Sequence, residues 1–290
     1  MQDFRNVTLT ALALFCFAAN SILCRLALAP RLIDPASFTT VRILSAATIL
    51  TGLIAIGRRK LPSLTKANWR STASLFTYLI FFSFAYARLS AGTGALILFG
   101  SVQMTMFGVV LRRGQRLRKL SWAGLGLAAA GLVYLVMPGI TAPDPVGLIF
   151  MIISGIAWGA FSLFAKGVDD PIKANACSFI GCVPLTAICS VWFLEDFHMS
   201  GTGFFLAIAS GAVASGIGYG MWYFALRYLP TTHASALQLL VPAIAAIGGD
   251  VLLSEPFTFR LVAASCALLG GVAVVVTQRP LAQSSGRLSA

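Results

Sequence analysis

Residues 145–166 read PVGLIFMIISGIAWGAFSLFAK, and Lys166 is the only charged residue in this run. An α-helix rises about 1.5 Å per residue, so a run of this length crosses the roughly 30 Å hydrocarbon core of a bilayer. A helix satisfies its own backbone hydrogen bonds in lipid, whereas a single strand does not. The run therefore predicts a transmembrane helix.

Similar apolar runs fill the chain and predict an all-α membrane protein. Prolines and charged residues separate the runs. The first run is longer than the apolar part of a signal peptide and no cleavage site follows it, so we expect it to be retained as a helix. The ten predicted transmembrane helices cover residues 7–28, 36–57, 68–89, 91–112, 120–137, 145–166, 173–194, 201–226, 231–253 and 258–277.

The composition excludes several classes of protein. Of the 290 residues, 58% are hydrophobic and 10% are charged, against about 25% charged in soluble domains. The net charge of +12 comes from basic residues between the apolar runs, which favours contact with the lipid bilayer and argues against nucleic acid as a partner. The six cysteines lie within apolar runs, so we expect neither disulfides, nor a metal site, nor a cofactor.

The basic residues also predict an orientation. If the N-terminus is cytoplasmic, all but five of the 21 Lys and Arg residues fall on the cytoplasmic side, as the positive-inside rule requires. Both termini are then expected in the cytoplasm. The five assigned to the outer side are Arg25, Arg31, Arg42, Arg88 and Arg260.

The two halves of the chain resemble each other weakly. At an offset of 140 residues, Phe84 and Gly131 recur as Phe224 and Gly271. Five helices per half is an odd number, so the second half would cross the membrane in the opposite direction. We therefore expect two inverted five-helix repeats, which are typical of alternating-access carriers with a site near the bilayer midplane. The predicted boundaries are 1–143 and 144–279, followed by a disordered cytoplasmic tail at 280–290.

The run from Leu229 to Val276 resembles the second half of an EamA-like repeat of the drug/metabolite transporter superfamily. The features are Pro242 within a helix, a Leu-rich stretch ending in Glu255, and a Gly-rich last helix. The first half departs from this pattern, with Val102 in place of the proline and Gln115 in place of the glutamate. Within the superfamily, the sequence is most similar to the bacterial aromatic amino acid exporters.

This resemblance implies a bacterial inner-membrane transporter that exports aromatic or other apolar amino acids, or related small metabolites. A carrier of the same fold for another solute remains an alternative. An intramembrane enzyme is a further one, but it needs an embedded nucleophile, base or metal ligand. The only histidines are His198 and His233, and no catalytic residue is predicted. The sequence leaves open the coupling ion, the oligomeric state and whether Asp250 or His233 titrates.

Aromatic residues are the first candidates for a substrate site. Tyr78 and Phe82 are four residues apart on one helix, as are Tyr219 and Tyr223 on another, so each pair lies on one face. Trp158 lies near the middle of its apolar run. These rings could stack on a flat apolar substrate, although helix packing also uses aromatic residues.

Uncharged polar residues within the apolar runs are the second group of candidates. Asn20, Ser21, Gln103 and Gln238 could hydrogen-bond a zwitterion, or they could instead join neighbouring helices. The first helix carries no embedded carboxylate. Exchange of a lipophilic cation for a proton is therefore disfavoured, because an amide does not titrate.

Overall fold

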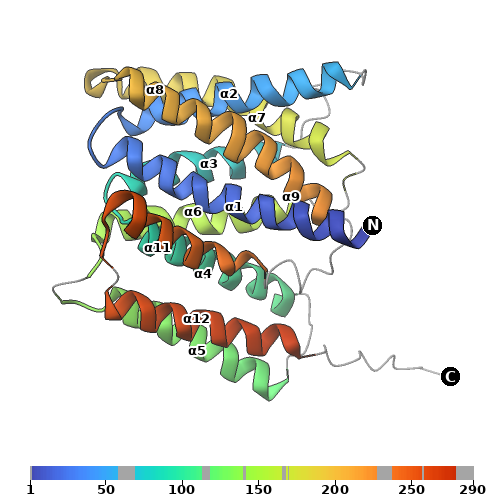
Figure 1. Ribbon diagram of the computed structural model, residues 1–290, viewed down its shortest axis with the longest axis vertical. Helices are drawn as coiled ribbons and strands as arrows, with labels where there is room; N and C mark the ends of the chain where they lie inside the picture. Colours follow the sequence, from blue (N-terminus) through green and yellow to red (C-terminus); the bar gives the residue numbers. More distant parts are fainter. Residues whose placement is uncertain are drawn as a thin grey trace.

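The computed structural model describes residues 2–57, 69–112, 118–139, 142–164, 168, 170–226, 237–256 and 258–278. The described residues are helical apart from short connections and one isolated bridge between Ile33 and Met199. The helices run roughly along one direction in a single bundle (Figure 1). The prediction of an all-α protein is confirmed.

The helices begin and end within a few residues of the predicted boundaries, with two exceptions. The first helix starts five residues earlier, and α11 starts nine residues after the start predicted at 231, where residues 231–236 lie outside the described part of the chain. In the first half they are α1 (Gln2–Leu28), α2 (Pro35–Ile56), α3 (Trp69–Tyr86), α4 (Ala91–Arg112) and α5 (Lys119–Val136). In the second half they are α6 (Pro145–Phe164), α7 (Pro171–Trp192), the 3₁₀ turn η2 (Leu194–Asp196), α8 (Gly201–Ile208), η3 (Ala209–Ile217), α9 (Gly218–Leu226), α11 (Leu240–Leu253) and α12 (Phe259–Thr277).

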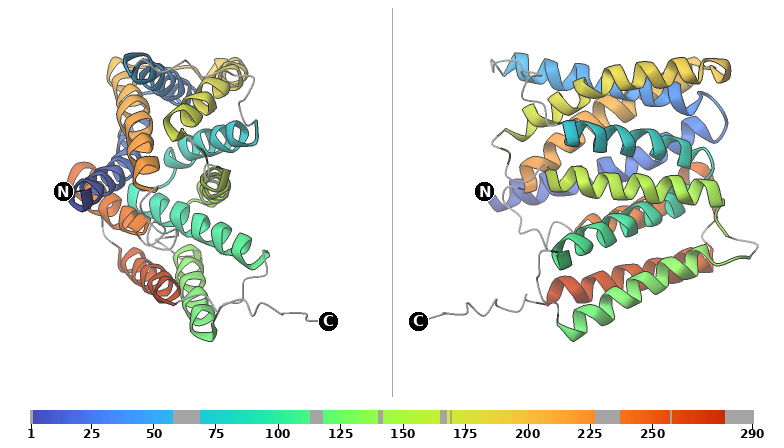
Figure 2. Two further views of the ribbon diagram at one scale, coloured as in Figure 1. Left: turned by 90° about the vertical axis from the view of Figure 1, so that its right-hand side faces the viewer. Right: turned by 180° about the vertical axis from the view of Figure 1, so that it is seen from behind.

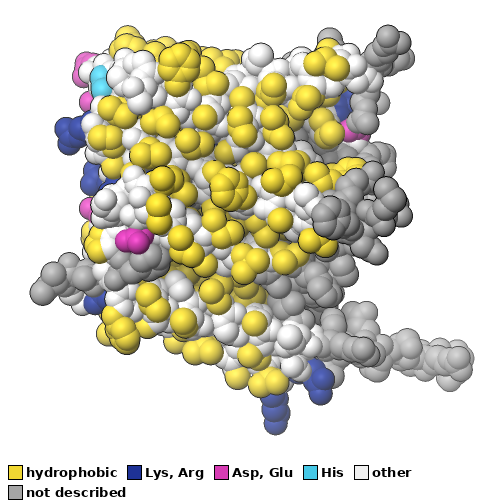
Figure 3. Space-filling model, in the orientation of Figure 1, with side chains coloured by type: hydrophobic (Ala, Val, Ile, Leu, Met, Phe, Trp, Pro, Cys, Tyr) yellow, Lys and Arg dark blue, Asp and Glu magenta, His cyan; other side chains and the backbone are white. Residues whose placement is uncertain are grey.

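Within the described residues, seven helices are long and apolar enough to cross a membrane. Leu240–Leu253 and Phe259–Val275 are apolar but shorter. The surface between the helix ends is mainly hydrophobic in the view of Figure 3, and the charged side chains lie mostly towards the ends. Apolar side chains such as Phe205 and Val251 are 70% and 72% exposed, which suits contact with lipid. The protein is therefore a multi-pass membrane protein.

The bundle has two edges and a centre (Figure 2). At one edge α5 packs against α12, where Gly124 and Gly271 allow close approach of the two backbones. At the other edge α2 packs against α7 and α8. Helices α1, α3, α4, α6, α9 and α11 lie between the edges.

We call the end of the bundle where α1 finishes and α2 begins the distal end. There the backbone N–H of Asp34 donates to His198 O at 3.0 Å, and that of Ser200 donates to Leu32 O at 2.8 Å. The connection between α1 and α2 is thereby joined to the one between α7 and α8, which ties the two halves of the chain together at this end.

Candidate functional site

An arginine lies at the centre of the bundle. Arg42, in α2, is completely buried. Its Nε donates to Ser215 Oγ at 3.0 Å, and its Nη2 donates to Tyr78 Oη at 3.4 Å and to Tyr219 Oη at 3.2 Å. Tyr219 Oη in turn donates to Tyr78 Oη at 3.1 Å. These partners are hydroxyl groups, and no ion pair of Arg42 with a carboxylate occurs within the described part of the chain.

Aromatic rings surround this guanidinium. Its carbon lies 4.9 Å from the ring centroid of Phe82 and 5.6 Å from that of Tyr78. The Trp158 ring lies 4.8 Å from both Tyr78 and Tyr219, and Phe17 packs edge-on against Trp158 at 5.8 Å. Cation–π contacts of this kind contribute about 0.5–2 kcal/mol each. The Arg42 cluster is defined as Phe17, Arg42, Tyr78, Phe82, Trp158 and Tyr219.

Two hydrogen-bond donors of the Arg42 cluster have no partner among the described residues. They are Arg42 Nη1 and Trp158 Nε1, and both atoms are buried. An unsatisfied buried donor costs about 1–3 kcal/mol, and more when the group is charged, so folded proteins seldom keep one without a role. Both side chains contact Tyr78 and Tyr219. The two donors therefore belong to one small region, where they are available to an acceptor that the described part of the chain does not supply.

The cluster is built from both halves of the chain. Its polar contacts run from Arg42 and Tyr78, in α2 and α3, to Ser215 and Tyr219, in η3 and α9. Its aromatic contacts likewise join Tyr78 to Trp158 in α6. Because the hydrogen bonds cross between the halves, a movement of one half against the other would change the surroundings of Arg42.

A π-helix brings Ser215 to Arg42. The nine residues of η3 read ASGAVASGI, and their small side chains let this segment lie close to α2. A Cβ atom on Gly211 would come within 2.8 Å of the Arg42 Cα, so the packing requires glycine there. π-Helical segments inside α-helices often occur at functional sites, and here η3 supplies one of the hydroxyls that hold the guanidinium.

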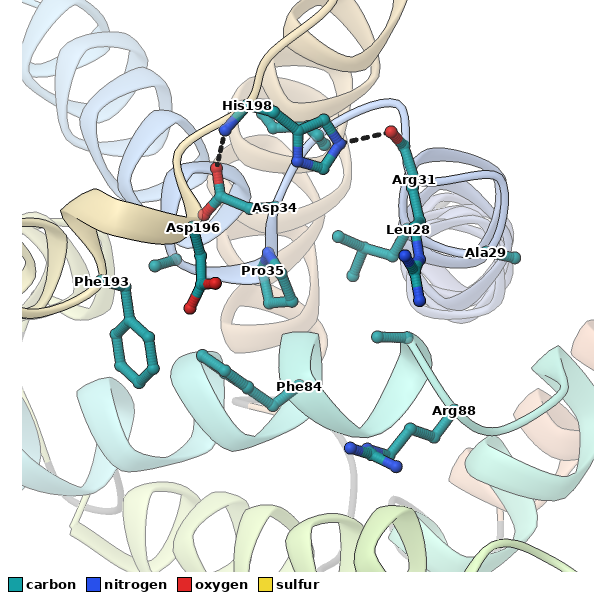
Figure 4. A pocket seen from close by; sticks show the side chains of 13 residues that line it. Leu28, Ala29, Arg31, Asp34, Pro35, Phe84, Arg88, Phe193, Asp196 and His198 are labelled. Atoms are coloured by element: carbon teal, nitrogen blue, oxygen red, sulfur yellow. Dashed lines mark hydrogen bonds between the residues drawn. The ribbon is translucent and has the colours of Figure 1, made fainter.

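A cavity of about 600 Å³ opens at the distal end (Figure 4). Asp34 lies in its wall and caps α2, with Oδ1 accepting from the Ser37 N–H at 2.8 Å and Oδ2 accepting from the His198 N–H at 3.2 Å. The His198 ring contacts the Arg31 carbonyl oxygen. The lining residues are Leu28, Ala29, Arg31, Ile33, Asp34, Pro35, Ala36, Phe84, Ala87, Arg88, Phe193, Asp196 and His198.

The distal cavity lies above the Arg42 cluster. Ala36 lines the cavity, and Arg42 is six residues further along α2, which corresponds to about 9 Å of helix. Thr39 lies between them and is fully buried, with its Oγ1 donating to Ser83 Oγ at 2.8 Å. Phe38 is also fully buried. The layer formed by Phe38, Thr39 and Ser83 is buried, and the two residues of α2 in it lie between Ala36 and Arg42 along the helix.

The structure brings together most of the aromatic residues that the sequence singles out. Tyr78, Phe82, Trp158 and Tyr219 all belong to the Arg42 cluster. The side chain of Tyr223 lies outside the described residues. A role for these rings in binding a substrate stays a prediction.

The polar candidates behave less uniformly. Asn20 Oδ1 accepts from Ser210 Oγ at 2.6 Å, which is the bond between helices that the sequence left as an alternative to substrate binding. Ser21, Gln103 and Gln238 are buried, and Gln238 Oε1 has no hydrogen-bond partner within the described ranges. Their roles as ligands also stay predictions.

Sequence reasoning missed Arg42, Phe17 and Ser215. The positive-inside count assigned Arg42 to the outer side, and the structure corrects this, because the side chain is fully buried between helices. The signal was present in the sequence: Arg42 is the only charged residue within the apolar run 36–57. A charge inside a transmembrane segment indicates a functional site unless a partner explains it.

The sequence also left open whether Asp250 or His233 titrates. Asp250 is exposed, and His233 lies outside the described residues. Across the described ranges, no group of three or more His, Cys, Asp or Glu residues could hold a metal ion.

The fold resembles that of a solved structure. A crystal structure matches with a TM-score of 0.67 and 18% identity, covering 93% of this chain and 98% of the other. At this identity the match shows the fold alone.

Curated relatives cover most of the chain. An uncharacterized protein of Pseudomonas aeruginosa is 42% identical over 96% of this chain and 97% of its own length. A protein of Archaeoglobus fulgidus, described as an uncharacterized transporter, is 25% identical over 86% of this chain and 91% of its own. A Salmonella typhimurium protein with the name "Probable amino-acid metabolite efflux pump" is 22% identical over 76% and 79%.

The EamA-like transporter family matches over residues 5–137 and again over 145–277, which together span nearly all of the sequence. This agrees with the resemblance seen in the run from Leu229 to Val276. The chain therefore belongs to the EamA-like transporter family.

Proposed function

We propose that the protein exports aromatic or other apolar amino acids, or related small metabolites, across the bacterial inner membrane by alternating access. The observation that carries this proposal is the Arg42 cluster, a buried group of aromatic rings and unpaired donors assembled from both halves of a transporter-family chain. Sites between two structural halves near the middle of the membrane are typical of such carriers.

In this proposal the cluster binds the substrate. The rings of Tyr78, Phe82, Trp158 and Tyr219 stack against its apolar part, and the unpaired donors on Arg42 and Trp158 take its polar end. Further proposed ligands follow from the sequence: Asn20, Ser21, Gln103, Tyr223 and Gln238.

The proposed architecture is ten transmembrane helices in two inverted five-helix repeats, at 1–143 and 144–279. The packing supports it, because α2 contacts α7, α4 contacts α11 and α5 contacts α12. In each of these pairs a helix of the first half meets the helix with the same rank in the second half. A two-fold axis between inverted repeats would produce this pattern. The stretches matched by the family have similar bounds.

The proposed direction places both termini in the cytoplasm, so the distal cavity faces the outside. Substrate leaving the Arg42 cluster would then pass the layer of Phe38, Thr39 and Ser83 to reach the cavity. Rocking of the halves would open this layer while closing the opposite end. The hydrogen bonds from Arg42 to Ser215 and Tyr219 would change during that movement.

Export of a different solute is the main alternative. The Archaeoglobus relative is named only as a transporter, and the Salmonella relative is named for amino-acid metabolites without specifying which. A buried, positively charged Arg42 disfavours polyamine-like and other cationic substrates. An intramembrane enzyme is a less favoured alternative.

The experiment is flux of radiolabelled phenylalanine across liposomes that contain only the purified protein. Saturable flux above that of empty liposomes is expected, together with competition by other aromatic solutes. Absence of flux for every tested solute would reject the carrier. Chemical conversion of the solute without net movement would instead favour the enzyme.

A further inference from the structure

The charge of the Arg42 cluster is unbalanced. Three acidic residues near the distal end already have partners: Asp34 caps α2, Glu255 pairs with Arg25 at 2.8 Å and Asp144 pairs with Arg88 at 3.6 Å. The other acidic side chains that the structure describes are those of Asp170, which caps α7, of Glu195 and Asp196 in η2, and of the exposed Asp250. The cluster therefore carries one positive charge, with no described carboxylate at hand to pair with it.

From this we propose that the Arg42 cluster is a carboxylate subsite, and that its preferred substrate is an aromatic monocarboxylate anion rather than a zwitterionic amino acid. The inference rests on the proposed transport function and narrows it to one chemical class. A bound carboxylate supplies both the missing negative charge and the missing hydrogen-bond acceptors.

The geometry favours a ligand held by two separate donors. Arg42 Nε and Nη2 are occupied by Ser215, Tyr78 and Tyr219, which leaves Nη1 as the free nitrogen of the guanidinium. Trp158 Nε1 is the second free donor. In the proposal, each of these two donors binds one oxygen of the carboxylate, and the hydrogen bond on the Arg42 side is charge-assisted. The three hydroxyls hold the guanidinium in place for this contact.

The side chains that define the Arg42 cluster offer no comparable site for an ammonium group. Moving it from water into the cluster requires an acceptor or an opposite charge, and the nearest fixed charge is the like-charged Arg42. An aromatic amine should therefore be excluded, and an amino acid should bind less tightly than the corresponding acid without the amino group.

Four ligands with the same phenyl ring test this ranking. They are 3-phenylpropionate, a monoanion; L-phenylalanine, a zwitterion; 3-phenylpropionamide, which is neutral; and phenethylamine, a cation. Binding to the purified protein in lipid nanodiscs is measured by calorimetry at pH 7. The acid should bind about tenfold or more tighter than its amide, phenylalanine should bind less tightly than the acid, and the amine should show no saturable binding.

Arg42→Gln is the matching variant, because it removes the charge and keeps a polar side chain among the three hydroxyls. The affinity ratio of acid to amide should fall to about one in this variant. Arg260→Gln is the control, since Arg260 lies on α12 at the edge of the bundle and donates to Met137 O. This control should keep the wild-type ratio.

Trp158→Phe gives an independent reading if Arg42→Gln does not fold. This substitution removes the Nε1 donor and keeps an aromatic ring, so it should reduce the affinity for the acid several-fold more than the affinity for the amide. If the affinity ratio of acid to amide is the same in the wild type and in Trp158→Phe, the proposed carboxylate subsite is wrong. A wild-type preference for phenylalanine or phenethylamine over 3-phenylpropionate would overturn it as well.

The two proposals can fail separately. If the protein moves phenylalanine across liposomes but the acid has no advantage over the amide, the carboxylate subsite is wrong and the carrier stands. If 3-phenylpropionate binds with the expected dependence on Arg42 but no solute moves, the subsite stands and the transport function is wrong.

Discussion

Truncation of the Trp158 side chain should selectively weaken the binding of aromatic substrates. The side chain is 4% exposed and its ring lies 4.8–5.8 Å from those of Tyr78, Tyr219, Phe161 and Phe17. A favourable pair of aromatic rings contributes about 0.5–1.5 kcal/mol beyond burial. If the substrate ring stacks on Trp158 as one further neighbour, Trp158→Ala should raise its dissociation constant about 2- to 12-fold.

The assay is competition for phenylalanine flux in liposomes by an aromatic and an aliphatic solute, for example 3-phenylpropionate and butyrate. The ratio of their inhibition constants should shrink in Trp158→Ala, because only the aromatic solute loses a stacking partner. Trp158→Phe is the control, since it keeps a ring and should keep most of the ratio. An unchanged ratio in Trp158→Ala that inserts and stays monodisperse would remove Trp158 from the site.

Three further outcomes are expected. Gly211→Val should lower the free energy of unfolding by about 1–3 kcal/mol, because the larger side chain would be overpacked against the Arg42 backbone. Gly220→Ala is the control and should not destabilise the protein, because its added methyl group would meet no atom within 4 Å. Thermal unfolding in detergent measures both effects. Glu255→Gln should cost about 1–2 kcal/mol by breaking the 2.8 Å ion pair to Arg25, also seen as a lower melting temperature. A fluorescent protein fused to the C-terminus should fluoresce, and alkaline phosphatase inserted within residues 193–200 should be active, if both termini are cytoplasmic.

For each of these three predictions, one result would contradict the reasoning. A Gly211→Val protein as stable as Gly220→Ala would mean that η3 does not need to lie so close to α2. An unchanged melting temperature for Glu255→Gln would show that the Arg25 pair adds nothing to stability. Active phosphatase at the C-terminus would reverse the proposed orientation.

Hydropathy predicted the helices well, because each helix must satisfy its own backbone in lipid. The run expected at 173–194 is the helix Pro171–Trp192, and the run expected at 36–57 is Pro35–Ile56. The π-helix η3 was not foreseen, since ASGAVASGI gives no signal that separates it from an ordinary α-helix. The segment packs against α2.

The candidate site could be predicted only in part. Spacing of four residues put Tyr78 and Phe82 on one face, and the two do meet Arg42. Arg42 was missed as a candidate because it was counted among the loop charges, although its position inside an apolar run was the stronger signal. Phe17 and Ser215 could not be found from the sequence, because only the packing of α1 and η3 decides which of their faces meets the centre.

The most direct measurement is side-by-side flux of labelled aromatic solutes through liposomes containing wild-type protein or Trp158→Ala. We expect saturable flux of at least one aromatic solute in the wild type, and reduced flux at subsaturating concentration in the variant. The central claim, that solute crosses the membrane through the Arg42 cluster, would be contradicted by wild-type flux that Trp158→Ala leaves unchanged, or by the absence of flux for all solutes tested.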